Sequence, residues 1–268
     1  MKSRLSRRSL ITDFGAAGLG LIVFSACGGS RDDTAAEPTD DAAVPDTEGA
    51  APEASQPATT DAGSPTSTSA DATGPLQLQH VSLGFVSAYV LVRGGEAAIV
   101  DTGTEGSRDA ILDGLDALAA TPSMVRHVVL THNHGDHIGG LAGLEADLSS
   151  ATLYAGAGDI GSIQSSLALS EVGDGDEVFG MGVIGTPGHT PGSISLFDTD
   201  SGILVAGDAI NGDGAGGLTG PNPDFSDDMA AALESVGKLA ALAPSTAAFG
   251  HGGGPVTDDV AAKLRALV

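Results

Sequence analysis

Residues 131–140 have the sequence THNHGDHIGG and follow the apolar, β-branched run VRHVVL without a break. Three histidines and one aspartate occupy six consecutive positions of this segment. On an extended backbone, His132 and His134 point to the same side, because side chains alternate. Asp136 and His137 begin a helix, so they face a second point nearby. One loop can therefore supply ligands to two metal positions.

Three more candidate ligands stand at the ends of later apolar runs. They are His189 in TPGHTPGS, Asp208 in VAGD and His251 in FGHG. Glycine and proline beside them let the backbone turn tightly and present each side chain at a sheet edge. Imidazole and carboxylate ligands suit zinc, iron or manganese, and the only cysteine in the chain is Cys27. The sequence predicts two divalent cations, with zinc favoured and iron or manganese also compatible.

This pattern, HxHxDH with a later His, Asp and His, resembles the metallo-β-lactamase fold superfamily over nearly all of residues 76–268. The segment VDTG resembles the first motif of the family, in which Asp101 would orient site residues from behind the ligands. The resemblance implies an α/β fold, a four-layer αβ/βα sandwich of two mixed β-sheets flanked by helices. It also implies that the first metal is held by His132, His134 and His189, the second by Asp136, His137 and His251, and that Asp208 bridges the two.

The chemistry implied by the resemblance is hydrolysis. Two cations hold a water molecule and lower its pKa to about 7, so a bridging hydroxide is the nucleophile at neutral pH. Asp136 would orient this hydroxide and carry its proton. Lactamases of the best-known type have Cys where Asp208 stands, so the site is more similar to the hydroxyacylglutathione hydrolase (glyoxalase II) and lactonase branches. We expect cleavage of a small neutral or cationic ester, lactone, thioester or amide.

Two other functions are compatible with the same ligand set. One is a non-catalytic accessory lipoprotein that binds metal, and the other is a redox enzyme with two irons that acts on persulfides or oxygen. The elements that would recognise a substrate are less well defined by the sequence. Phe85, Asn211 and the Gly-rich loop of residues 209–223 are candidates, although such a loop can equally be a plain connection.

The composition excludes one large class of partners. The chain of 268 residues has 11 Lys and Arg against 35 Asp and Glu, with a formal charge of -24, 3% aromatic residues and no Trp. Nucleic acids are bound by basic side chains that displace counterions, and single strands also by aromatic platforms. We therefore expect a small-molecule substrate and no nucleic acid, while the sequence carries no signal for oligomeric state.

The first 27 residues have the organisation of an export signal, with a basic start, an apolar run and small residues before Cys27. The apolar run is shorter than the roughly 20 residues that a spanning helix needs. The segment SRRSLI resembles a twin-arginine motif, and FSAC resembles a lipobox with Cys27 as the lipidation site. We expect a lipoprotein anchored to the bacterial cell membrane outside the cytoplasm, or otherwise a secreted protein.

Residues 28–75 consist mainly of Ala, Asp, Glu, Ser, Thr, Pro and Gly, which predicts a disordered acidic linker. Short β-branched runs then alternate with Ala- and Leu-rich segments, which predicts one catalytic domain of residues 76–268 with mixed sheets. Within it, His127 is predicted to be a hydrogen-bonded core residue or a residue that supports the ligands from behind, and His80 a strand residue that faces solvent. Strands are predicted at residues 79–84, 88–93, 97–100, 125–130, 151–154, 177–183, 193–197 and 202–205, and helices at residues 107–119, 136–146, 160–167, 227–242 and 256–267.

Overall fold

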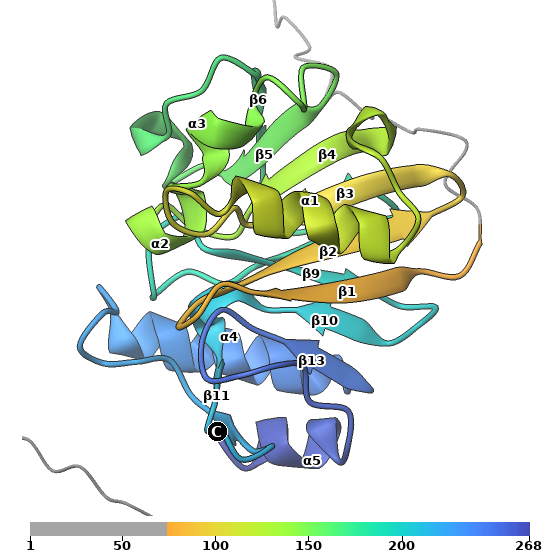
Figure 1. Cartoon of the computed structure of the whole chain (residues 1–268). Coiled ribbons are helices and arrows are strands. Elements are labelled where there is room, and N and C mark those ends of the chain that lie inside the picture. The colour runs from red at the N-terminus through yellow and green to blue at the C-terminus, as the bar shows by residue number, and fades with distance from the viewer. Residues whose placement is uncertain (1–73) are drawn as a thin grey trace, which may run out of the picture. The chain divides into compact units, whose positions relative to one another are not determined.

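The computed structural model describes residues 74–268 (Figure 1). The predicted signal peptide of residues 1–27, its lipidation site Cys27 and residues 28–73 of the predicted linker lie outside the described residues. Within the part of the chain that is described, no helix is long and apolar enough to cross a lipid bilayer.

The first half of the described chain builds a six-stranded mixed sheet. Its strands are β1 (Gln77–Ser82), β2 (Ser87–Arg93), β3 (Glu96–Val100), β4 (Val125–Leu130), β5 (Thr152–Gly156) and β6 (Ala168–Val172). They lie side by side in chain order, antiparallel from β1 to β3 and parallel from β3 to β6. Both faces of β2 are buried, as its largely apolar sequence SAYVLVR requires of an inner strand.

The second half of the chain builds a five-stranded mixed sheet. Its strands are β7 (Glu177–Val178), β8 (Met181–Gly185), β9 (Ile194–Asp198), β10 (Ile203–Val205) and β13 (Thr246–Ala248). Their order in the sheet is β13-β10-β9-β8-β7, and only the β10–β13 pair is parallel. Strands β8, β10 and β13 therefore run in the same direction, and β9 runs against them.

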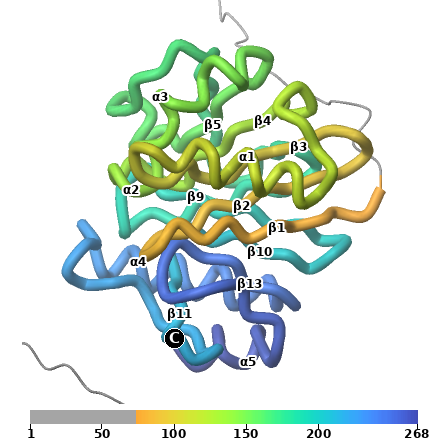
Figure 2. Tube along the Cα trace, in the orientation of Figure 1, coloured from red at the N-terminus to blue at the C-terminus, as the bar shows by residue number. Residues whose placement is uncertain are grey.

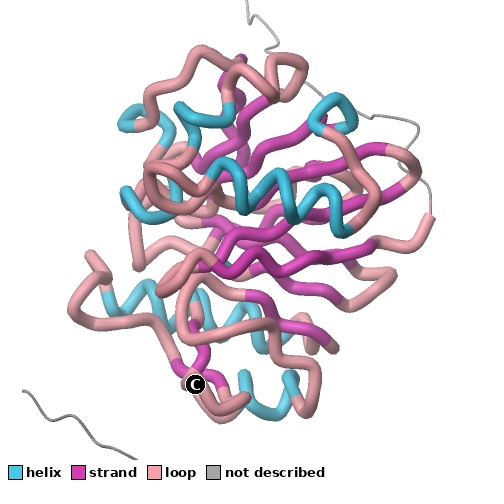
Figure 3. The backbone as a smooth tube through the Cα atoms, in the orientation of Figure 1, coloured by secondary structure: helices cyan, strands magenta, loops and turns pink. Residues whose placement is uncertain are grey.

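Helices lie on the outer faces of the two sheets, which form the middle of the molecule (Figure 3). Figure 2 shows that the chain completes the first sheet and its helices, coloured orange to green, before it begins the second. The helices are α1 (Arg108–Ala117), α2 (Gly135–Ile138), α3 (Leu141–Leu144), α4 (Met229–Ala241) and α5 (Val260–Arg265), with 3-10 turns η1 (Pro122–Met124), η2 (Ile160–Ser162) and η3 (Gly207–Ala209), and a small hairpin of β11 (Asn211–Gly212) and β12 (Leu218–Thr219).

Three apolar clusters separate the four layers. One lies between the first sheet and α1, where Val90 and Leu115 are both buried. The second fills the space between the two sheets and includes Leu91 and Met181. The third packs the second sheet against α4 and α5 and includes Leu239. Figure 1 shows α1 across the first sheet and α4 and α5 beyond β10 and β13, so the predicted αβ/βα sandwich of two mixed sheets is confirmed.

Two predicted elements near the middle of the chain are wrong. The strand predicted at residues 177–183 is a tight hairpin, because Phe179 and Gly180 have φ of 56° and 69° and form a two-residue turn between β7 and β8. The helix predicted at residues 160–167 is reduced to the short turn η2, and the chain then continues as the edge strand β6. Strands β6 and β13 were not predicted.

Two other predicted helices are shorter than expected. The helix predicted at residues 136–146 is divided into α2 and α3, because Gly140 passes against the backbone of Thr102. A Cβ atom at Gly140 would lie only 2.0 Å from the carbonyl oxygen of Thr102. The helix predicted at residues 256–267 is shortened to α5, since Val256 forms an isolated bridge to β13. The remaining predicted helices match α1 and α4 to within two residues at each end.

Candidate metal centre

All seven predicted ligands lie at one edge of the sandwich. The loop HNHGDH follows β4, whereas His189, Asp208 and His251 follow β8, β10 and β13. Because these three strands run in the same direction, their carboxyl ends meet at the same edge of the second sheet. The backbone N–H of Ile194 donates to the carbonyl of Thr131 at 2.9 Å and ties the two sheets together there.

The first ligand group consists of His132, His134 and His189. Nε2 of His189 lies 3.2 Å from Nε2 of His132 and 3.0 Å from Nδ1 of His134. On the outer side, Nδ1 of His132 lies 3.0 Å from the hydroxyl of Thr131, and Nδ1 of His189 lies 3.3 Å from the hydroxyl of Ser226. These outer contacts turn Nε2 of both rings toward a common point, as ligand orientation requires.

The second ligand group consists of Asp136, His137 and His251. Nε2 of His251 lies 3.3 Å from Nε2 of His137 and 3.3 Å from Oδ2 of Asp136. Nδ1 of His137 donates to a carboxylate oxygen of Asp101 at 2.8 Å, and Nδ1 of His251 donates to the carbonyl of Phe85 at 2.8 Å. Both imidazoles are therefore fixed in the orientation that leaves Nε2 free for a cation.

Asp208 stands between the two groups. Its Oδ2 lies 3.3 Å from Nε2 of His251 and 3.5 Å from Nε2 of His189, and its Oδ1 lies 3.4 Å from Nε2 of His137. Gly250 makes this approach possible, because a Cβ atom there would lie 2.0 Å from Oδ1 of Asp208. The carboxylate has the position that a bridging ligand requires.

Asp101 is buried at the end of β3, with 3% exposure and a left-handed φ of 60°. Its Oδ1 accepts the backbone N–H of Thr131 at 2.8 Å, and its Oδ2 accepts the hydroxyl of Thr131 and Nδ1 of His137, also at 2.8 Å. One carboxylate thus links the start of the ligand loop to a ligand of the second group. This is the arrangement expected of a residue that orients site residues from behind the ligands.

Sequence analysis missed Asp159, which holds the two loops of the first group together. Its Oδ2 accepts the backbone N–H of Asn133 at 3.0 Å and the hydroxyl of Thr190 at 2.6 Å, and its Oδ1 accepts the backbone N–H of Gly192 at 2.8 Å. Asn133 lies within the HNHGDH loop, and Thr190 follows the ligand His189. Asp159 is 1% exposed. The only sequence signal is an acid in the otherwise small, apolar segment that follows β5.

Burial and neighbouring charges shift the pKa values of the ligands in opposite directions. Burial lowers the pKa of His132 well below its usual range and also lowers the pKa of His189. Burial acts against protonation of His137 too, but the adjacent carboxylates outweigh it and raise the pKa of His137. A hydrogen bond to Asp208 is the main cause that raises the pKa of His251 to about 9. For Asp208 itself, burial opposes ionisation, yet the surrounding imidazoles lower the pKa of its carboxyl.

The residues present fit two divalent cations. Two ligands of one tetrahedral ion at 2.0–2.1 Å lie about 3.3 to 3.4 Å apart. The donor contacts within each group measure 3.0 to 3.3 Å, close to that separation. Oδ1 of Asp208 is buried and has no hydrogen-bond partner, so it is left as a donor for a cation. Imidazole and carboxylate donors suit zinc, iron and manganese alike.

Comparison with known proteins matches this chain to the metallo-beta-lactamase superfamily over residues 81–156 and 165–251. The chain belongs to this superfamily. The two matched segments contain all seven ligands of the centre. The superfamily binds divalent metal ions, typically two and often zinc, and the chain is a metal-dependent hydrolase of this superfamily, as the sequence predicted.

Individual relatives are similar over the same region. The chain is 30% identical over 196 residues to the uncharacterized protein YobT of Bacillus subtilis, covering 62% of this chain and 83% of that protein. It is 31% identical over 156 residues to a hydroxyacylglutathione hydrolase of Thermosynechococcus vestitus, covering 57% of this chain and 56% of the relative. A solved metallo-beta-lactamase family protein from Thermus thermophilus is 26% identical, with a TM-score of 0.55 and coverage of 72% of this chain and 77% of that one.

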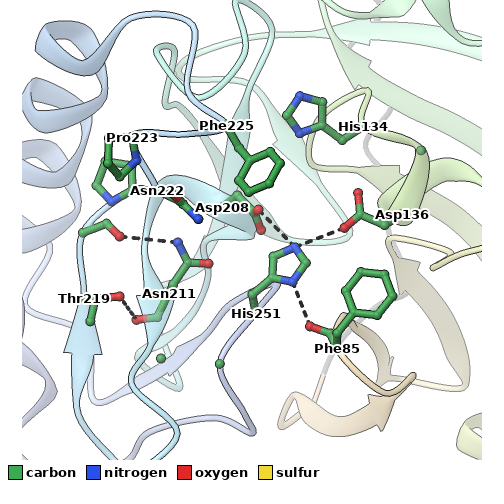
Figure 4. Close-up of a pocket in the computed structure, with 15 residues that line it drawn as sticks. Phe85, His134, Asp136, Asp208, Asn211, Thr219, Asn222, Pro223, Phe225 and His251 are labelled. Carbon is green, nitrogen blue, oxygen red and sulfur yellow. Dashed lines mark hydrogen bonds and ion pairs between the residues drawn. The ribbon is translucent and has the colours of Figure 1, made fainter. Parts of the chain in front are cut away.

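A cleft of about 850 Å³ opens over the two ligand groups (Figure 4). Four ligands line it, together with Phe85 and Phe225, residues of the β11–β12 segment and the turn that follows. The candidate pocket residues Phe85 and Asn211 both line the cleft. Of the other histidines, His127 is buried as predicted, whereas His80 is half-buried and its Nε2 lies 2.9 Å from the hydroxyl of Ser87. The lining residues are Phe85, His134, Gly135, Asp136, Asp208, Asn211, Gly212, Thr219, Gly220, Pro221, Asn222, Pro223, Phe225, His251 and Gly252.

Proposed function

We propose that the protein is a dinuclear metallohydrolase that cleaves a small, uncharged ester, lactone, thioester or amide. The observation that carries this proposal is the shared carboxylate of Asp208, which lies within 3.5 Å of donor atoms from both ligand groups. A carboxylate between two cation positions holds them close together, which is the arrangement used in two-metal hydrolysis.

Two divalent cations held by these residues would polarise a substrate carbonyl and supply a nucleophile from water at neutral pH. Among the protein side chains, Asp136 has the main role in the reaction. It lines the cleft and is 28% exposed. A carboxylate in this position would lie beside a water molecule held at the centre, where it can accept a proton and deliver it to the leaving group. His132 and His189 are each 1% exposed, which keeps bulk water away from the inner side of the centre.

The preference for an uncharged substrate follows from the charges around the cleft. Every charged or titratable side chain that lines it belongs to the ligand set, and no Lys or Arg is among the lining residues. A substrate that carries carboxylates, such as a glutathione thioester, would find no basic side chain to pair with. This feature supports a neutral substrate over the one named for the hydroxyacylglutathione hydrolase relatives.

Metal analysis and a substrate panel on one preparation test the proposal. Protein purified without chelator should contain about two zinc ions per chain by mass spectrometry. Its hydrolysis of simple esters or lactones should disappear on chelation and return with zinc. Two irons with oxygen consumption would favour the di-iron redox alternative, and two metals without hydrolysis of any compound would favour the accessory-protein alternative. Less than one metal per chain after reconstitution would contradict the dinuclear centre.

A matched pair of variants tests the part given to Asp136. Asp136→Asn keeps a similar shape but cannot carry the proton, so kcat should fall by roughly 100-fold or more in protein that mass spectrometry shows to hold two metals. Asp109→Asn changes an exposed acid on α1 and should leave kcat unchanged. Equal kcat values for Asp136→Asn and the wild type would contradict the proton-carrying role.

We also propose that the protein works outside the cytoplasm, held to the membrane by a lipid on Cys27. The support is the sequence of residues 1–27, with its basic start, apolar run and cysteine at the end of FSAC. Cys27→Ser should move the protein from the membrane fraction to the soluble fraction. Membrane retention of this variant would contradict the lipid anchor.

A further inference from the structure

Two aromatic side chains stand exposed in the cleft. Phe85 is 66% exposed and Phe225 is 65% exposed, more than any other large apolar side chain of residues 74–268. Single exposed apolar residues are ordinary, but two rings on one cleft beside a metal centre are characteristic of a ligand site. In Figure 4 the ring of Phe225 lies above the imidazole of His251 and the ring of Phe85 lies below Asp136, and both line the same cleft.

The ring of Phe85 is held in place by the second ligand group. It stacks on the imidazole of His251, with centroids 6.0 Å apart and planes 13° apart. Its carbonyl accepts Nδ1 of His251, and the next residue, Val86, forms an isolated β-bridge to His251. The backbone N–H of Leu83 also donates to the carbonyl of Val86 at 2.9 Å and closes the turn. Phe85 is therefore a preorganised wall of the cleft.

The backbone turn that carries Phe225 is connected to the first ligand group. Its backbone N–H donates to the carbonyl of Asn222 at 3.2 Å, and the hydroxyl of Ser226 donates to the same carbonyl at 2.8 Å. The hydroxyl of Ser226 also lies 3.3 Å from Nδ1 of the ligand His189. The ring of Phe85 thus contacts a histidine of the second group directly, whereas the backbone that carries Phe225 is positioned through Ser226 beside a histidine of the first group.

We propose that Phe85 and Phe225 hold an apolar, uncharged portion of the substrate, so that the hydrolysed compound is an uncharged ester, lactone, thioester or amide with an aliphatic or aromatic group. This inference rests on the proposed hydrolase function and specifies the substrate class. The volume of about 850 Å³ lies within the range of small-molecule sites and leaves room for such a group beside the reacting bond.

The rest of the lining agrees with this class of substrate. Pro221 and Pro223 add apolar surface, and Asn211, Asn222 and Thr219 offer hydrogen-bonding groups without charge. An ionised group placed between two phenylalanine rings would lose water without gaining a counter-charge, which disfavours anionic compounds.

A series of 4-nitrophenyl esters tests the inference on the metal-loaded protein. From acetate to butanoate, hexanoate and octanoate, kcat/KM should rise by up to about 4-fold for each methylene that enters the cleft. The 4-nitrophenyl ester of hemisuccinate, which carries a carboxylate, should be hydrolysed at least about 10-fold less efficiently than the butanoate. A flat series or a preference for the anionic ester would overturn the inference.

Variants test whether the preference for longer esters depends on Phe85 and Phe225 or on any exposed apolar side chain. Phe85→Ala and Phe225→Ala should each reduce the increase of kcat/KM with ester chain length. Phe85→Leu should retain part of that increase. Leu233→Ala removes another exposed apolar side chain, 45% exposed on α4 and outside the cleft lining, and should leave the rise unchanged. An unchanged rise in both alanine variants of the phenylalanines would show that these rings do not contact the substrate.

Binding of ketones keeps the inference testable if the proposed function itself fails. The matching 2-alkanones are uncharged and cannot be hydrolysed, and their binding is measured by ligand-observed NMR. Absence of ester, lactone, thioester and amide hydrolysis in protein with two metals would overturn the hydrolase proposal. Ketone affinity that rises with chain length in the wild type, but not in the alanine variants, would still support the aromatic walls. Ketone affinity that is independent of chain length would overturn them.

Discussion

The two ligand groups of the centre use the same side chain, imidazole, in opposite electrostatic settings. In the first group, His132 and His189 are almost fully buried, and their outer nitrogens contact neutral hydroxyls. Burial lowers the pKa of both. In the second group, His137 and His251 lie among carboxylates, and the pKa of His251 is raised to about 9.

This difference indicates a division of work between the two sides of the centre. A ligand must lose its proton before it binds a cation, so the first group is ready to bind, whereas cations and protons compete for the second. The second group is also the more accessible, since Asp136 and His251 are each 28% exposed. The second group therefore combines exposure to the cleft with competition from protons, whereas the buried histidines of the first group have no proton to lose at neutral pH.

Removal of the shared ligand Asp208 should weaken metal binding by both groups, and it should have the largest effect on metal affinity of the variants considered. In Asp208→Ala both cation positions lose a ligand, and the buried imidazoles lose the carboxylate that lies between them. Metal affinity at both positions should fall by roughly 100-fold or more, beyond the effect of residues that only support ligands. Metal content by mass spectrometry and ester hydrolysis measured together check this.

Asp213→Ala is the matched control for this variant. Asp213 lies in the same loop, accepts the backbone N–H groups of Ala215 and Gly217, and does not line the cleft. Its removal should leave both metals and the activity in place. Two metals and full activity in Asp208→Ala would show that the carboxylate does not bridge.

Asp101→Asn should affect the second group most, because Asp101 contacts His137 directly and reaches His132 of the first group only through the Thr131 hydroxyl. Asp101 accepts Nδ1 of His137, and an amide in its place cannot offer the same charged acceptor to both His137 and the Thr131 hydroxyl. Loss of such a supporting partner costs about 10- to 100-fold in metal affinity. Titration with zinc against a competing chelator should show one position close to wild type and one weakened by that factor.

Asp159→Asn should affect the first group alone, and more weakly. Asp159 acts through the backbone of Asn133 and Gly192 and the hydroxyl of Thr190, and it touches no ligand side chain. We expect about a 10-fold loss of affinity at one position. If Asp101→Asn and Asp159→Asn weaken the same position, the two groups are not independent and the comparison fails.

The ligands were predictable because their signal is local. His132, His134, Asp136 and His137 follow one another after an apolar strand, and strand direction explains why later ligands reach the same edge. Asp159 was not predictable, because two of its three partners are backbone N–H groups 26 and 33 residues away. A sequence shows side-chain chemistry but not which distant N–H groups need an acceptor.

The fold errors have a related cause. Strand β6 is largely exposed, so it lacks the buried alternation by which a strand is recognised. The helix predicted at residues 136–146 fits the local pattern of Ala and Leu, but contact between Gly140 and Thr102 divides it. Local preference predicts an element correctly only where tertiary contacts agree with it.

His127 is a buried imidazole that belongs to neither ligand group, so its pKa can be compared with those of the buried ligands. It lies in β4, is 6% exposed, and neither ring nitrogen has a hydrogen-bond partner. Its ring packs against Tyr154 and Phe179, with centroids 5.7 Å and 5.5 Å away. Burial lowers the pKa of His127, although Glu96 acts in the opposite direction. Burial therefore outweighs the nearby carboxylate at this imidazole.

The folded-state pKa of His127 lies below the usual value of about 6.5, so the unfolded chain takes up a proton first as the pH falls. With respect to this ring, the free energy of unfolding has its full value above about pH 6.5 and decreases as the pH falls below that value. In His127→Phe this loss is absent. The free energy of unfolding should therefore fall less between pH 7 and pH 5 than in the wild type, as measured by urea unfolding.

His80→Phe provides the matched comparison for this smallest effect. The ring of His80 also lies near a tyrosine, 5.5 Å from Tyr89, but it is only half-buried and its Nε2 contacts the hydroxyl of Ser87. Release of metal at pH 5 affects both variants alike, so the difference between them isolates the buried ring. Burial lowers the pKa of His80 as well, so His80→Phe should change the pH dependence in the same direction but by less. No change in pH dependence in either variant would mean that burial does not set the pKa of His127. The low pKa of the first ligand group would then need a cause other than burial.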